Sequence, residues 1–277
     1  MRFDSVVFAD SASLAALSCF SRLTCEREAG RKSLVITLSD SSGAEVIAAR
    51  GLATVRPLAE IEGGDDSAFA PWRERVSVQI RRFNPRHVMA PLGLLGAPQA
   101  IDYFKTLRAA LSVDPGRDLL FFEERPHCLV PEALPLRLAG LGIRLPPAIE
   151  LRSARRHAPF ALRLTTGLGV PPIFGGLRDR YRLSQSLKTA FEDAAEWDPQ
   201  RALGPKLQPV TEPWADRHTG ELFALAAELG QGACLGSREA FRRRMARHAS
   251  GTGSPTWVER YWLSLPGPTE SDPIGDA

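Results

Sequence analysis

The chain has 277 residues, of which 44% are hydrophobic, so it is long enough to bury the core of one large α/β domain. Its 35 Lys and Arg nearly balance its 32 Asp and Glu, and a net charge of +3 argues against a general nucleic-acid surface. The sequence lacks the run of about 18 apolar residues that a membrane span needs. Its four cysteines show no CxxC spacing. We therefore expect a soluble, cytoplasmic protein that binds neither nucleic acid nor membrane.

In the first half of the chain, short β-rich runs alternate with helical patterns. This alternation predicts parallel strands joined by right-handed crossovers. The expected strands are residues 5–8, 33–37, 87–90 and 119–122, and the expected helices are residues 14–28, 72–83 and 100–111. Gly30 should stop the first helix, and Asn84 with Pro85 should close the second. In open sheets of this kind, ligands bind outside the carboxyl ends of the strands.

The second half of the chain has a different character. A run of arginines over residues 152–182 surrounds a turn rich in Gly and Pro, and helices are expected at residues 181–195, 220–229 and 237–248. The tail, residues 266–277, has a disordered composition. We therefore predict one domain over residues 1–265, with a motif-bearing core at 1–126 and a C-terminal part at 127–265.

Five segments of the chain resemble a known family and keep the order found there. The first is a strand, a small-residue turn and a helix over residues 6–19, and the others are residues 28–38, 83–96, 118–126 and 258–262. Together they resemble the LmbE-like (PIG-L) N-acetylglucosaminyl deacetylases over nearly the whole chain. This resemblance implies an α/β fold with a Rossmann-like, mostly parallel sheet flanked by helices, and a mixed C-terminal extension.

The positions that carry the zinc chemistry of that family hold other residues here. The family's His-Pro-Asp-Asp aligns with Ser11, Ala12, Ser13 and Leu14, and its His-x-Asp-His aligns with Ala97, Pro98, Gln99 and Ala100. A zinc site needs about four N, S or O ligands, and Ser11, Leu14 and Ala100 are not normal zinc ligands. The general-base position holds Ser13, whose hydroxyl titrates far from neutral pH. The resemblance therefore implies a degenerate member with no zinc and no other cofactor.

Three functions remain open at this point. The first is a catalytically inactive pseudoenzyme that binds a partner protein, such as an active paralogue or an enzyme of a glycan or natural-product pathway. The second is a metal-independent enzyme with a remodelled cleft, for which Glu123, Glu124 and His127 form the best polar group at a strand end. The third is a protein that binds a sugar-like small molecule in the strand-end cleft. The joint loss of all the metal ligands favours the first function.

Overall fold

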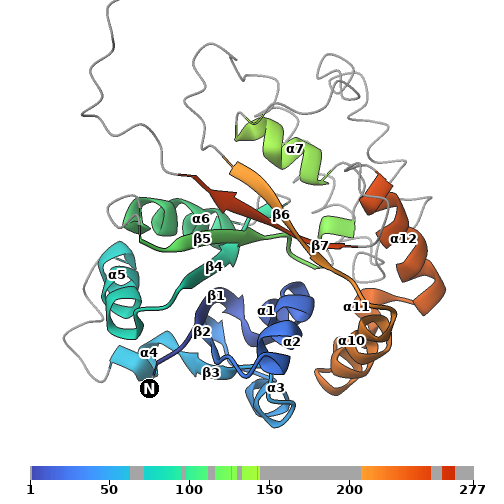
Figure 1. Ribbon diagram of the computed structural model, residues 1–277, viewed down its shortest axis with the longest axis horizontal. Coiled ribbons are helices and arrows are strands. Elements are labelled where there is room, and N and C mark those ends of the chain that lie inside the picture. The colour runs from blue at the N-terminus through green and yellow to red at the C-terminus, as the bar shows by residue number, and fades with distance from the viewer. Residues whose placement is uncertain are drawn as a thin grey trace, which may run out of the picture.

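The computed structural model describes residues 2–62, 72–94, 98–111, 116–125, 127–129, 133–141, 143, 207–250 and 258–265. Within these residues, seven strands form one sheet in the order β3-β2-β1-β4-β5-β7-β6 (Figure 1). Strands β1 to β5 run parallel, and β7 runs antiparallel to both β5 and β6. The strands are β1 (Ser5–Ser11), β2 (Ser33–Asp40), β3 (Thr54–Pro57), β4 (His87–Pro91), β5 (Asp118–Phe122), β6 (Leu207–Pro213) and β7 (Val258–Ser264). The mostly parallel sheet expected from the sequence is confirmed.

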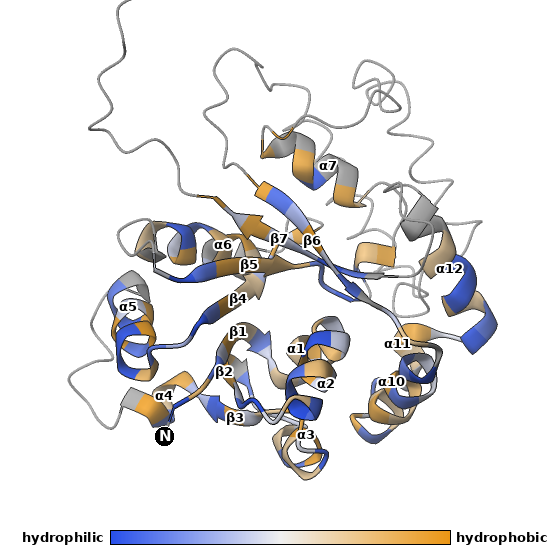
Figure 2. Ribbon diagram, viewed as in Figure 1, coloured by the Kyte–Doolittle hydropathy of each residue, from blue (hydrophilic) through white to orange (hydrophobic). Residues whose placement is uncertain are grey.

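The central strands are continuous apolar runs because helices cover both of their faces. Val6, Val7 and Phe8 of β1 are fully buried, as are the residues that follow His87 in β4. Figure 2 shows this apolar band along the sheet, with hydrophilic residues on the outer sides of the helices. All four strands predicted from the sequence are present, each extended by one or more residues.

The direction of the chain across the sheet reverses at β1, and this reversal decides which face each helix covers. Strands β1, β2 and β3 progress one way and β4 and β5 the other. Right-handed crossovers then place helices on opposite faces. Accordingly, α5 and α6 lie together on one face, and α1, α2 and α3 lie on the other (Figure 1). The first five helices in the chain are α1 (Ala12–Ser18), α2 (Phe20–Glu28), α3 (Ala44–Ala49), α4 (Leu58–Glu62) and α5 (Trp72–Phe83), followed by α6 (Pro98–Leu111).

The predicted helix ends are confirmed by the backbone. Gly30 follows α2 with a φ of 69°, a left-handed conformation that glycine adopts without steric cost. Asn84 follows α5 with a φ of 45°, and its N–H still donates to the Ile80 carbonyl. Asparagine tolerates this conformation better than most residues do, and Pro85 prevents the helix from continuing.

The single helix expected over residues 14–28 is wrong in one respect, because it is interrupted at Cys19. In a continuous helix the Ser18 carbonyl would accept a hydrogen bond from the Arg22 N–H. Here a guanidinium nitrogen of Arg125 donates to the Ser18 carbonyl at 3.4 Å, and the Arg22 N–H donates to Glu259 at 3.0 Å. Arg125 and Glu259 also pair with each other at 2.6 Å. Two paired side chains from distant parts of the sequence thus replace one backbone hydrogen bond of the helix.

The C-terminal part adds the antiparallel strands β6 and β7 to the edge of the sheet. Its helices are α7 (Ala133–Gly140), α10 (Asp216–Glu228), α11 (Gly232–Leu235) and α12 (Arg238–Ser250), with the 3-10 turn η3 (His127–Leu129) after β5. The helices predicted at 220–229 and 237–248 are confirmed with shifted ends, whereas residues 181–195 and the tail lie outside the described residues. Across the part of the chain that the structure describes, each helix is too short or too polar to span a bilayer.

Candidate functional site

The carboxyl ends of β1 and β4 lie at the point where the strand order reverses, which is the usual ligand site of such sheets. Ser11 is the last residue of β1 and lies opposite Asp40 of β2. Its side-chain oxygen accepts the Leu14 N–H at 3.2 Å, and its backbone is extended. Ser11 is therefore the N-cap of α1, and this local role explains why a serine suits the position.

Ser13, at the position of the family's general base, is enclosed by neighbouring elements. Its side chain is buried, and its hydroxyl donates to the Ser42 carbonyl at 3.4 Å. Gly43 lies against it with a φ of 82°, and a Cβ on this glycine would come within 2.3 Å of Leu229. The turn after β2 and the end of α10 thus cover Ser13. A bidentate ion pair between Arg50 and Glu228, at 2.9 and 2.6 Å, ties α10 to the end of α3 nearby.

The second set of motif positions lies at the start of α6. This helix begins at Pro98, two residues earlier than predicted, because proline is well suited to the first turn of a helix. Gln99 and Ala100 lie in that first turn, and Ala100 is buried. Ala97 lies outside the described residues. Leu14, from the first set, is half-buried on α1.

These residues do not fit the zinc ion of the family. The side chains of Leu14 and Ala100 have no ligand atom, and the oxygen of Ser11 is already an acceptor for a backbone N–H. Among the residues that the structure describes, no group of three or more His, Cys, Asp or Glu side chains is arranged to hold a metal ion. We therefore derive no chemistry from a metal at this edge.

Glu123, one of the three polar candidates, is used in a buried ion pair. Its carboxylate accepts hydrogen bonds from the Arg260 guanidinium at 2.5 and 3.1 Å, and from the Trp262 indole N–H at 2.8 Å. All three side chains are buried. This charge-assisted, bidentate pairing joins the end of β5 to β7 and leaves Glu123 poorly placed to act on a ligand.

Glu124 is in a different environment, although it is the next residue. Its side chain is 1% exposed, and its Oε1 accepts the N–H groups of Gly93 and Leu94, both at 2.9 Å. Its Oε2 is buried without a hydrogen-bond partner in the described part of the chain. Burial raises the pKa of Glu124 to about 7, although the backbone N–H of Glu124 itself, the Leu94 and Gly93 N–H groups and the charge of Arg137 lower it in part.

His127, the third candidate, lies in η3. Burial lowers the pKa of His127 to about 4, so the imidazole is neutral at pH 7. In the contacts described, Glu123 is engaged with β7, Glu124 holds the turn after β4, and burial makes His127 a weak base. That these three residues form a candidate catalytic group stays a prediction.

The sequence reasoning missed the residues that join three of the five family-like segments. Arg125 donates to the Leu17 carbonyl at 2.7 Å, and its backbone N–H donates to the Ser18 hydroxyl at 2.9 Å. Its partner Glu259 also accepts the Tyr261 hydroxyl at 2.5 Å. Residues 17–19, 123–125 and 258–262 thus meet in one buried region. The segments that carry the resemblance are largely those that hold the fold together.

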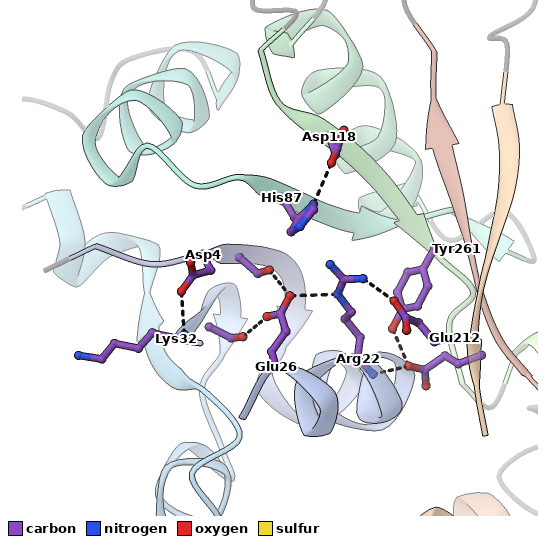
Figure 3. A network of polar contacts seen from close by, with 11 residues as sticks. Asp4, Arg22, Glu26, Lys32, His87, Asp118, Glu212 and Tyr261 are labelled. Carbon is purple, nitrogen blue, oxygen red and sulfur yellow. Dashed lines mark hydrogen bonds and ion pairs between the residues drawn. The ribbon is translucent and has the colours of Figure 1, made fainter. Parts of the chain in front are cut away.

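A second buried cluster lies near the amino ends of the strands. Glu26 of α2 is fully buried and accepts the hydroxyls of Ser5 at 2.6 Å and Ser33 at 2.5 Å, as well as the Arg22 guanidinium at 3.0 Å. Arg22 also pairs with Glu212 of β6 (Figure 3). The one sequence signal for this cluster is an acidic residue on the apolar face of a helix, where a charge is buried only if it is paired.

The fold and the strand-end site can be compared with known proteins. No protein-family model and no curated protein matches the chain. Among solved structures, a triple mutant (Orf2*T) of a deacetylase from the teicoplanin biosynthetic pathway is 12% identical, with a TM-score of 0.53 over 96% of this chain and 98% of that one. The A40926 pseudoaglycone deacetylase Dbv21 is 13% identical, with a TM-score of 0.53 over 98% of this chain and 100% of that one. The zinc-inhibited form of the teicoplanin deacetylase Orf2 is 11% identical, with a TM-score of 0.51 over 94% of this chain and 97% of that one.

The class that these observations define is a deacetylase-like α/β fold. The chain shares the architecture of the teicoplanin and A40926 deacetylases over nearly its full length. The LmbE-like fold implied by the resemblance is confirmed. At identities this low, the likeness establishes the fold and leaves the activity to the residues of the site.

Proposed function

We propose that this protein is a catalytically inactive, deacetylase-like pseudoenzyme that acts in the cytoplasm by binding a partner protein. The partner would be an active paralogue or an enzyme of a glycan or natural-product pathway. The fold and the deacetylase activity of its structural neighbours support this pathway context.

The observation that carries the proposal is the use of the motif serines. Ser11 caps α1, and Ser13 is buried with its hydroxyl directed to a backbone carbonyl. A hydrolase needs an activated nucleophile or water and a base within about 3 Å of it. Neither serine has a basic side chain as a hydrogen-bond partner in the contacts described. A protein with this fold but without that chemistry retains binding as its means of action.

A second candidate function follows from Glu124 alone. Its unpartnered buried oxygen and its pKa of about 7 are properties of acid–base groups in active sites. They favour either a metal-independent reaction or the binding of a sugar-like ligand at the strand-end cleft. The neutral His127 and the engaged Glu123 give this candidate less support than the first.

The proposal is tested by complementation of a host that lacks the gene. The double variant Ser11→Ala, Ser13→Ala removes both hydroxyls, and Arg155→Glu, Arg156→Glu reverses charge in the basic run at 152–182, which lies outside the described residues. Arg242→Glu, Arg243→Glu on exposed positions of α12 is the matched control. We expect the serine variant and the control to support function and the Arg155, Arg156 variant to lose it. Loss in the serine variant alone, with circular dichroism unchanged, would overturn the proposal.

A further inference from the structure

Glu124 connects the ends of two neighbouring parallel strands. It lies two residues beyond β5, and the two N–H groups that it binds belong to the turn after β4. Gly93 adopts a φ of 84°, a left-handed conformation that turns its N–H and that of Leu94 toward one carboxyl oxygen. The carboxyl of Glu124 therefore fixes the turn that leads toward α6, on the edge where ligands bind in such folds.

The same turn has little freedom on its other sides. A Cβ on Gly93 would lie 3.2 Å from both the Arg137 guanidinium and the Ile101 side chain. Arg137 donates to the Leu92 carbonyl at 2.9 Å and lies over the Phe104 ring at 5.0 Å. Release of the turn from Glu124 would thus change the contacts of α6 and α7 together.

The N–H groups of Gly93, Leu94 and Glu124 itself favour the ionised carboxylate of Glu124, but burial outweighs them. Its Oε2 has no donor among the described residues, and a buried acceptor without a donor is costly, more so when it carries charge. A neutral carboxylic acid has no charge to solvate and retains a carbonyl oxygen for the Gly93 and Leu94 N–H groups. The closed arrangement therefore suits the protonated form.

We propose that Glu124 is a proton-operated latch on the carboxyl edge of the sheet. When its carboxyl is protonated, Glu124 holds the turn after β4 against the end of β5. Loss of the proton favours an open arrangement in which water reaches the carboxylate. This inference concerns the same edge as the proposed function but does not depend on whether the protein binds a partner or catalyses a reaction.

The charged and titratable groups around Glu124 define the pH range of the latch. Arg137 on α7 stays positively charged throughout this pH range and favours the ionised form of Glu124. Cys128 in η3 has a pKa raised to about 12 by burial, so its thiol remains neutral throughout. Next to Glu124 in the chain, Glu123 and Arg125 are paired with Arg260 and Glu259. Among the described neighbours, His127 titrates nearest to this range, because burial lowers its pKa to about 4.

Linkage gives the sign of the effect. A solvated glutamate has a pKa of about 4.3, and in the closed arrangement burial raises the pKa of Glu124 to about 7. The ratio of open to closed protein therefore rises as the pH increases between these two values, by up to about tenfold for each pH unit. Above pH 7 both arrangements are ionised, and the ratio no longer changes.

The test is amide hydrogen exchange of Gly93 and Leu94 by NMR, in the full-length protein from pH 5 to 9, with rates corrected for intrinsic exchange. We expect the protection of both amides to fall as the pH rises to about 7 and to level off above it. In Glu124→Gln, an isosteric neutral side chain, protection should be independent of pH in this range. Glu239→Gln, at an 80% exposed position on α12, is the matched control and should behave as the wild type.

Two results would overturn the latch. One is the same pH dependence in the wild type and in Glu124→Gln, which would assign the effect to His127 or to global unfolding. If Glu124→Gln does not fold, the wild-type protein labelled with ¹³C at its glutamate side chains serves instead. The carboxyl of Glu124 should then titrate together with the Gly93 and Leu94 amide shifts, and a titration that leaves those shifts unchanged would equally exclude the latch.

Discussion

Two regions of this protein differ in how their polar side chains are used. At the carboxyl edge, the positions that the resemblance aligns with zinc ligands hold Ser11, Leu14 and Ala100, and the serine oxygen caps a helix. In the buried cluster around Arg125 and Glu259, Arg125, which follows β5, pairs with Glu259 of β7 at 2.6 Å, and Glu259 also accepts the backbone N–H of Arg22 in α2 at 3.0 Å. Charge is therefore concentrated where segments distant in sequence must be joined. Among the described residues of this edge, the side chains of Leu14 and Ala100 offer no atom that could bind a metal ion.

This difference teaches that a resemblance to an enzyme family can rest on its architecture. Ser18 accepts the Arg125 N–H, and Arg125 closes the carbonyl end of α1, so the family-like Leu17-Ser18-Cys19 segment has a structural purpose. The same holds for Glu123, which binds Arg260 and Trp262. The residues that hold the fold together are therefore not the same as those that the resemblance aligns with the zinc chemistry.

The largest expected effect is on stability, from Arg125→Leu. This change leaves Glu259 buried without its partner and removes the donor from the Leu17 carbonyl. Breaking one side of a buried ion pair costs about 3–5 kcal/mol. Urea denaturation followed by circular dichroism measures the loss. In the control, Arg217→Leu, the exposed pair with Glu28 should contribute less than about 1 kcal/mol. Equal losses in the two variants would contradict the structural role of the Arg125 cluster.

The second effect is on the pH dependence of stability, through Glu124. Because its folded pKa is raised to about 7, its contribution to stability is fully present below about pH 4.3 and is lost as the pH rises through 7. The wild type should lose about 3 kcal/mol relative to Glu124→Gln over this range. His127 acts in the opposite direction, since its lowered pKa costs stability as the pH falls below about 6.5, but it is present in both proteins and cancels. A difference that stays constant with pH would show that Glu124 is ionised when folded.

The third and smallest expected effect is on the unfolding free energy, from removal of either of two helix N-caps. Ser11 and Ser237 each accept a backbone N–H at 3.2 Å, at the starts of α1 and α12. Removal of a serine cap costs about 1 kcal/mol, so Ser11→Ala and Ser237→Ala should lower the unfolding free energy similarly. Neither should impair function in the host. Loss of function in Ser11→Ala alone would show that the carboxyl edge still uses this hydroxyl for more than capping.

The sequence predicted the parallel part of the sheet well, because strands such as β1 and β4 are uninterrupted apolar runs. It did not predict β3, β6 or β7. Strand β3 has only four residues and ends in Arg56-Pro57, so its sequence is too short to show the alternation that indicates a strand. Strand β6 contains Pro209 and Pro213, which argue against a central strand but are tolerated here because β6 is at the edge of the sheet.

The candidate site was predictable in its position but not in its contacts. The turn chemistry after β1 placed Ser11 and Ser13 at the carboxyl edge. The break at Cys19 could not be predicted, because it depends on Arg125 and Glu259, which are 107 and 237 residues from the groups that they bind. Likewise, the adjacent glutamates in the sequence do not indicate their different partners. Glu123 pairs with Arg260, whereas Glu124 binds the turn at Gly93.

The most direct test of the account is release of free amine from an N-acetylglucosamine conjugate by the purified protein, without metal and with added Zn²⁺, Fe²⁺ or Co²⁺. The residues at the zinc-ligand positions predict a rate equal to that of the protein-free blank under every condition. Metal-dependent turnover that disappears in Ser11→Ala or Ser13→Ala would contradict the central claim that this deacetylase-like fold acts without hydrolytic chemistry.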